Sequence, residues 1–252
     1  MEHFDKLAGG KYKADYFDSD KEYYSALAEQ IACSFGYGDI ILDVGAGPGC
    51  SAMLANDMDL EVKIIGLEPS DLYKDSEKLS SELKENGSCV DYVVVNAGVG
   101  KLDDLYRNTN LNLDGVIISR ALHEIARSIG SIKGVYDQLK TISRYVKKEG
   151  FFVVGEPQFT KEAMEHPYSD EVIKAARKCT EAKYGHSSGP EEFVTRDQFE
   201  EWMISLGYGI HTENNIEDLT ETFDAVRDAG FKLEKSPYES YFLSMIKTNI
   251  FL

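Results

Sequence analysis

The chain has 252 residues, of which 42% are hydrophobic and 28% are charged, so it can bury a sizeable core and has the composition of a soluble globular protein. Its formal net charge of -17 argues against binding to nucleic acid, and no apolar run reaches the length of a membrane span. The N-terminal residues lack the order of a signal peptide, and the four cysteines form no C-x-x-C pair. A cytoplasmic protein without a metal site is therefore expected.

Strand and helix patterns alternate through the central part of the chain, which predicts a parallel sheet flanked by helices. Near the C-terminus, a helical pattern is followed by Gly230, and the segments FKLEKS and SYFLSMIKT predict a closing antiparallel hairpin. The expected strands of the central part are 39–44, 62–67, 90–95, 115–119 and 151–154, and the expected helices are 51–58, 76–85, about 131–147 and 219–229.

Two segments interrupt this alternation. Residues 1–30 precede the first strand and are rich in tyrosine and phenylalanine, and residues 157–218 have helical and loop patterns without a clear strand. A connection as long as the second segment is usually a lid or a binding insert. We therefore predict a single domain, residues 1–252, in which residues 1–30 form a cap segment and residues 157–218 form a helical lid insert over the site.

A glycine loop with the sequence DVGAGPG occupies residues 43–49, between the first strand and the first helix. Its glycines let a ligand approach the backbone, and the helix beyond supplies free N–H groups. The Gly-Lys-Ser/Thr ending of a P-loop is absent. A dinucleotide fingerprint would have Gly or Ala in place of Cys50, and Asp43 would repel a pyrophosphate but suits a cationic group. A tight structural turn is the remaining alternative.

This loop resembles motif I of the class I methyltransferases that depend on S-adenosylmethionine (SAM). The resemblance covers about residues 39–156 and, more weakly, the C-terminal segment. It implies an α/β fold with a Rossmann-like, seven-stranded, mostly parallel sheet, in which the last strand is antiparallel, and it implies SAM as the cofactor. The loop residues that would bind SAM are Asp43, Gly45, Ala46, Gly47 and Gly49.

Three further positions carry the resemblance. Glu68, followed by Pro69, lies 21 residues after Gly47, where the family has an acid that accepts hydrogen bonds from the ribose. Asn96 and Ala97 stand where the family usually has an Asp beside the adenine, so this contact departs from the pattern. The stretch DGVIISRALHEI resembles the small-molecule methyltransferases. It places three residues near the methionine part of SAM: Ser119, Arg120 and Ala121.

The implied function is methyl transfer to a small molecule. The signatures of nucleic-acid methyltransferases are absent, since SRAL follows the fourth strand where an amino-directed enzyme would have D/N-P-P-Y/F, and no Pro-Cys nucleophile is present. A protein side chain is a weaker option as acceptor. Two other classes stay open: a SAM-binding protein that does not methylate, such as a sensor or a cofactor-assisted cyclase or decarboxylase, and a nicotinamide-dependent oxidoreductase.

His123 is the candidate general base, because it follows the fourth strand by four residues and its unperturbed pKa near 6.5 suits proton transfer. Glu124 and Glu156 are rival bases or groups that orient the imidazole, and the alternative role for His123 is to pack or cap the helix that begins there. The candidates for contact with the acceptor come from the two variable segments, each with a surface or packing role as its alternative: Tyr12, Tyr16, His166, Tyr184 and His186.

Overall fold

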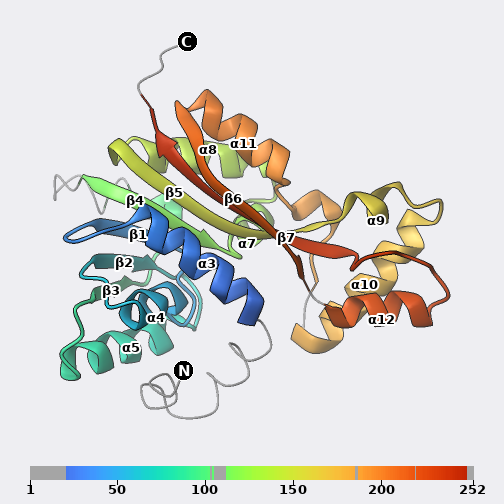
Figure 1. The fold of residues 1–252 in the computed structure, drawn as a ribbon, viewed down its shortest axis with the longest axis horizontal. Coiled ribbons are helices and arrows are strands. Elements are labelled where there is room, and N and C mark those ends of the chain that lie inside the picture. Colours follow the sequence, from blue (N-terminus) through green and yellow to red (C-terminus); the bar gives the residue numbers. More distant parts are fainter. Residues whose placement is uncertain (1–20, 103, 105–111, 185–186, 219, 249–252) are drawn as a thin grey trace.

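Seven strands form one sheet in the order β3-β2-β1-β4-β5-β7-β6 (Figure 1). The computed structural model describes residues 21–102, 104, 112–184, 187–218 and 220–248. β7 runs antiparallel to both of its neighbours, and the pairs among β1 to β5 are parallel. The predicted fold class is confirmed. The strands are β1 (Ile40–Val44), β2 (Lys63–Leu67), β3 (Asp91–Val95), β4 (Leu113–Ser119), β5 (Val146–Phe159), β6 (Tyr208–Asp218) and β7 (Tyr238–Lys247).

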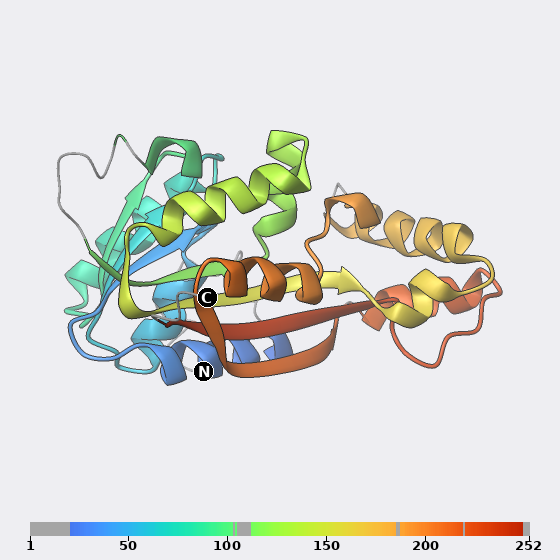
Figure 2. The same cartoon turned by 90° about the horizontal axis from the view of Figure 1, so that it is seen from above.

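Helices cover both faces of the sheet (Figures 1 and 2). Alternate residues of the central strands enter opposite cores: Ile41 packs with the first group of helices, and Leu42 packs with the second. This burial on both sides explains why the residues of β1 are apolar except for Asp43. The first group is α3 (Lys21–Ser34), α4 (Cys50–Asp57) and α5 (Tyr73–Glu85), and the second is α7 (Leu122–Ile129), α8 (Ile132–Ser143) and α11 (Arg196–Ser205).

The C-terminal half of the sheet differs from the sequence prediction. β6 lies inside the segment 157–218, where no strand was expected, and it, rather than FKLEKS, pairs with β7. β6 is an edge strand whose side chains are mostly exposed, so it lacks the apolar pattern of a buried strand. β5 is also longer than predicted at both ends, and it begins at Val146, where a helix was expected to continue.

A small helical lobe lies beyond one end of the long strands β5 and β7 (Figure 2). It consists of α9 (Lys161–Glu165), α10 (Ser169–Tyr184) and α12 (Thr220–Asp228), and the short η2 (Pro190–Glu192) leads from it back to the sheet. The lobe has a core of its own, which includes Phe159 from β5 and Tyr238 from β7. The insert is therefore helical only between β5 and β6. Among the described residues, no helix is both long and apolar enough to span a membrane.

Candidate functional site

A cavity of about 970 Å³ lies beyond the carboxyl ends of β1, β2 and β4. β1 pairs with β2 on one side and β4 on the other, so the cavity occupies the point where the strand order reverses, which is the usual ligand site of such sheets. Most of the site residues predicted from the sequence line this cavity. They are Asp43, Gly45, Ala46, Gly47, Glu68, Pro69, Ser119, Arg120, Ala121, His123 and Glu124.

The glycine loop is held against the end of β2 by its backbone. The N–H groups of Gly45 and Ala46 donate to the carbonyl of Leu67 at 2.9 and 3.0 Å. Gly47 has a φ of +55°, and a Cβ there would meet nothing closer than the Gly45 carbonyl at 3.9 Å, so this position opens onto the cavity. Gly45 is different, because a Cβ on it would lie 2.6 Å from the Cβ of Ala121.

Glu68 ties the loop to the segment that follows β2. Its Oε2 accepts from the N–H of Gly47 at 2.8 Å, and its Oε1 accepts from the N–H of Ser70 at the same distance. Glu68 itself is buried, with only 6% of the residue exposed. A carboxylate oxygen has two lone pairs, so each oxygen can still accept from a ligand hydroxyl while it holds the backbone.

Three residues predicted to bind the cofactor do not line the cavity. Gly49 is the N-cap of α4, where a Cβ would lie 2.5 Å from the Cδ2 of Leu79, so its role is packing. Asn96 is exposed, and the N–H of Ala97 donates to the carbonyl of Val95 at 2.8 Å. Residues 98–100, which include the first two residues of η1 (Val99–Lys101), line the cavity instead.

Asp43 carries a buried carboxylate at the base of the loop. The residue is 1% exposed, and its Oδ2 has no hydrogen-bond partner among the described residues. Burial raises its pKa to about 7, with a further rise from the charge of Glu68 and a partial offset from a hydrogen bond with Ser51. An unpaired buried acceptor is costly, so this position is suited to a cationic ligand group.

Helix α3, the first helix of the described residues, contributes a wall beside the end of β4. Tyr24 lines the cavity, and Tyr23 donates from its hydroxyl to the carbonyl of Gly155 at 2.6 Å. The same hydroxyl lies 2.9 Å from the Oγ of Ser119, and the guanidinium of Arg120 lies 3.9 Å above the Tyr23 ring. Arg120 has a φ of +51°, a strained conformation for a non-glycine residue of the kind found at functional sites.

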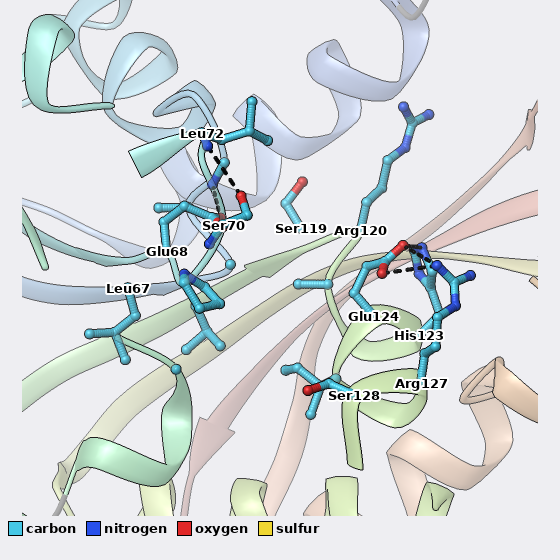
Figure 3. A pocket seen from close by; sticks show the side chains of 18 of the residues that line it. Leu67, Glu68, Ser70, Leu72, Ser119, Arg120, His123, Glu124, Arg127 and Ser128 are labelled. Atoms are coloured by element: carbon cyan, nitrogen blue, oxygen red, sulfur yellow. Dashed lines mark hydrogen bonds and ion pairs between the residues drawn. The ribbon is translucent and has the colours of Figure 1, made fainter. Parts of the chain in front are cut away.

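Glu156 and His123 form a buried ion pair where β5 meets α7. Glu156 is fully buried, and its two oxygens accept from the N–H groups of Leu122 and His123 at 3.2 and 3.0 Å, which caps α7. The Nδ1 of His123 makes a short contact with the same carboxylate, and its Nε2 lies 3.4 Å from Glu124 (Figure 3). Burial lowers the pKa of His123, but the charge of Glu156 and the hydrogen bonds to both carboxylates outweigh it and raise the pKa to about 9.

Arg127 connects α7 to the insert. Its Nη1 donates to both oxygens of Glu124 at 3.1 Å, its Nε donates to Glu192 at 3.4 Å, and its Nη2 donates to the hydroxyl of Ser188. Phe193, which follows η2, lies with its ring centroid 5.5 Å from that of His123. These contacts place residues of the insert on the far wall of the cavity: Thr180, Ser187, Ser188 and Phe193.

The remaining candidates for acceptor contact are not brought to the cavity. His166 does not line it, and its Nδ1 accepts from the N–H of Tyr168 at 3.1 Å. Tyr184 is the last residue of α10, and its side chain lies outside the described part of the chain. Tyr12, Tyr16 and His186 also lie outside the described residues.

The fold is shared with many solved structures. One is geranyl diphosphate C-methyltransferase from Streptomyces coelicolor, in complex with Mg2+, geranyl diphosphate and S-adenosyl-L-homocysteine (TM-score 0.59, 12% identity, 93% of this chain and 82% of the other). Another is a SAM-dependent methyltransferase from Geobacter sulfurreducens, in complex with S-adenosyl-L-homocysteine (0.55, 15%, 90% and 90%). A third is the [4+2]-cyclase SpnF (0.58, 14%, 96% and 83%). The chain has the fold of the class I SAM-dependent methyltransferases. No protein-family model and no curated protein matches the sequence.

Within this methyltransferase fold, the cavity includes residues that sequence reasoning did not select. A Gly-x-Gly pattern at residues 98–100 was visible after the third strand, and these residues line the cavity. The insert residues carried no such signal, because their position depends on the path of a long connection. No cluster of three or more potential metal ligands occurs in the described part of the chain.

Proposed function

We propose that this chain binds SAM at the glycine loop and transfers its methyl group to a small-molecule acceptor. The buried Oδ2 of Asp43, which has no hydrogen-bond partner among the described residues, carries this proposal, because Asp43 lines a cavity whose glycine loop opens at Gly47. The ammonium of the methionine moiety supplies the cation that this oxygen lacks. Solved structures with the same fold were obtained with S-adenosyl-L-homocysteine, which supports the choice of cofactor.

The other residues of the cavity fit the remaining parts of this cofactor. Glu68 lies at the end of β2, where it can accept from ribose hydroxyls, and Ser119 and Arg120 lie at the end of β4 for the methionine moiety. A volume of about 970 Å³ is at the upper end of the range for small-ligand sites, so a second small molecule has room beside the cofactor. The acceptor then lies between α7 and the insert, against Ser128, Thr180 and Phe193.

When bound, SAM supplies a methyl group on a sulfonium, which is already activated for displacement. The chain contributes position and exclusion of water. The insert and α3 enclose the cavity from two sides, and the hydroxyls of its far wall can orient a polar acceptor. We accordingly propose that the helical part of the insert and the N-terminal segment act together as a lid on the acceptor side.

A second candidate is a SAM-binding protein that does not methylate, and the ion pairs of His123 favour it, since they leave this residue without a free nitrogen to take a proton. SpnF, a solved structure with the same fold as this chain, is a [4+2]-cyclase. Incubation with methyl-labelled SAM and a metabolite extract separates the two: S-adenosylhomocysteine and a labelled product support methyl transfer. Retention of intact SAM with no labelled product contradicts it.

Replacement of Glu68 by alanine is expected to weaken SAM binding by about 2 kcal/mol, or roughly 30-fold. The variant loses the ribose contacts and also the clamp on the Gly47 N–H. Calorimetry measures the effect, with Glu77→Ala on α5 as the control, because Glu77 is an exposed carboxylate outside the cavity. Equal affinity of the folded Glu68 variant and the wild type would refute the ribose assignment.

Replacement of Arg127 by methionine is expected to loosen the wall formed by the insert. The apolar stem remains, but the contacts with Glu192 and Ser188 are lost. Charge-assisted hydrogen bonds of this kind contribute about 1.5 kcal/mol, so limited proteolysis within residues 183–193 should become roughly tenfold faster. Arg227→Met is the matched control, since Arg227 makes the same i,i+3 ion pair on α12 away from the cavity. Equal cleavage rates in the two variants would contradict the connecting role of Arg127.

A further inference from the structure

We propose that His123 is an imidazolium at neutral pH that positions α7 and the acceptor wall rather than taking a proton, and that the site methylates an acceptor atom which carries no proton at neutral pH. Such an atom is found in a carboxylate or in an aromatic ring nitrogen that bears no hydrogen. The first half concerns the residue alone, and the second half rests on the proposed methyl transfer.

The geometry of the two ring nitrogens carries the first half. Nδ1 is in contact with Glu156, and Nε2 lies 3.4 Å from Glu124. A carboxylate can only accept a hydrogen bond, and a neutral imidazole has one donor nitrogen and one acceptor nitrogen. Only the doubly protonated ring satisfies both partners, so a neutral ring would leave one nitrogen lone pair facing a carboxylate oxygen.

The groups around the ring come from three elements. Glu156 approaches from β5, Glu124 lies on α7, and Phe193 of the insert presents an aromatic ring. Arg127 lies behind Glu124 and pairs with it, and the phenol of Tyr241 on β7 is close enough to Glu156 to feel its charge. Glu156 has no exposed surface, so loss of the imidazolium charge would leave a buried carboxylate without its counter-ion.

This arrangement leaves no neutral base on the acceptor side among the described lining residues. Glu124 contacts both His123 and Arg127, so its carboxylate oxygens are already engaged with side chains of α7. Asp43 and Glu68 are at the cofactor end of the cavity. An alcohol must lose a proton as it is methylated, and these residues supply no base to take it.

The acceptors named above need no such loss. The electron pair of the acceptor forms the new bond to the methyl carbon, the carbon–sulfur bond breaks, and its electron pair stays on sulfur. A carboxylate and a sulfonium thereby give a neutral ester and a neutral thioether, and no proton is transferred. The imidazolium of His123 then holds α7 and the acceptor wall in place, and the carboxylates of Glu156 and Glu124 balance its charge.

The charge of His123 is measured directly by NMR of histidine-labelled protein, with its signals assigned by their loss in His123→Gln. We expect both ring nitrogens to be protonated at pH 7.5 and the titration midpoint to lie near 9. Glu124→Gln should lower that midpoint, whereas Glu165→Gln on α9, which removes an exposed carboxylate paired with Lys161, should not. A wild-type midpoint at or below 7 would overturn the first half of the proposal.

The acceptor class is tested with methyl-labelled SAM and a metabolite extract, followed by NMR identification of the labelled atom. We expect a methyl ester or a methylated ring nitrogen, and a kcat that is constant from pH 6 to 8. A methyl ether, or a kcat that rises about tenfold per pH unit, would overturn the second half. Absence of any labelled product while SAM binds would contradict the proposed methyl transfer and leave the measured charge of His123 standing.

Discussion

Replacing Gly47 by valine is expected to abolish measurable SAM binding while the protein stays folded. Gly47 has a φ of +55°, a conformation that costs a residue with a side chain roughly 1–2 kcal/mol. A Cβ at this position meets nothing but the Gly45 carbonyl at 3.9 Å, so the new side chain can occupy the space in which the ligand must lie. Steric exclusion then adds to the strain, and calorimetry with SAM should show no heat of binding.

The backbone strain and the steric exclusion of the ligand can be separated with the variant Gly87→Val. Gly87 has a φ of +69°, is exposed, and has no atom within 4 Å of the position of a Cβ. It does not line the cavity, so its substitution imposes similar backbone strain without filling the site. We expect a similar loss of thermal stability in both variants and normal SAM affinity only in the Gly87 variant. Normal affinity in the Gly47 variant would contradict the placement of SAM against this loop.

The sequence predicted the central part of the fold because burial there is strong and local. β1 is covered on both faces, so all of its residues except Asp43 are apolar, and glycines follow it where the loop has positive φ angles. The position of Glu68 beside the cavity was predictable for the same reason, since it directly follows a short buried strand. Rules of this kind work where neighbours in the chain determine the structure.

Contacts between distant segments were not predictable in this way. β6 is exposed and polar, and its strand conformation comes from pairing with β7, which lies about 20 residues further along the chain. The hydroxyl of Tyr23 meets Ser119 and Gly155 only because α3 packs across the sheet. The position of His123 was predicted, but its charge depends on Glu156, 33 residues away, and a sequence pattern gives no measure of that distance.

Replacing Asp43 by asparagine is expected to weaken SAM binding by about 3 kcal/mol at pH 8, or more than 100-fold, because a buried charge pair is lost. The affinity of the wild type should also depend on pH. In the free protein, burial holds the pKa of Asp43 near 7, and a cationic ligand requires the ionised form. Below pH 7 the carboxyl must release a proton on binding, so affinity falls by up to about tenfold per pH unit. Asp43→Asn removes this dependence.

The raised pKa of Asp43 also affects the stability of the ligand-free protein. The pKa of Asp43 in the folded state lies above the ordinary aspartate value of 3.8. Between pH 3.8 and 7 the folded state therefore holds more protons than the unfolded state, and this residue lowers stability as pH rises through that window. Asp43→Asn should therefore gain stability relative to the wild type as pH rises from 4 to 8, as measured by thermal unfolding without ligand. Asp39→Asn, one residue before β1 at its opposite end, is the control for SAM affinity, because Asp39 does not line the cavity. A wild-type affinity that stays constant from pH 5 to 8 would contradict the role of Asp43 as the partner of the ammonium group.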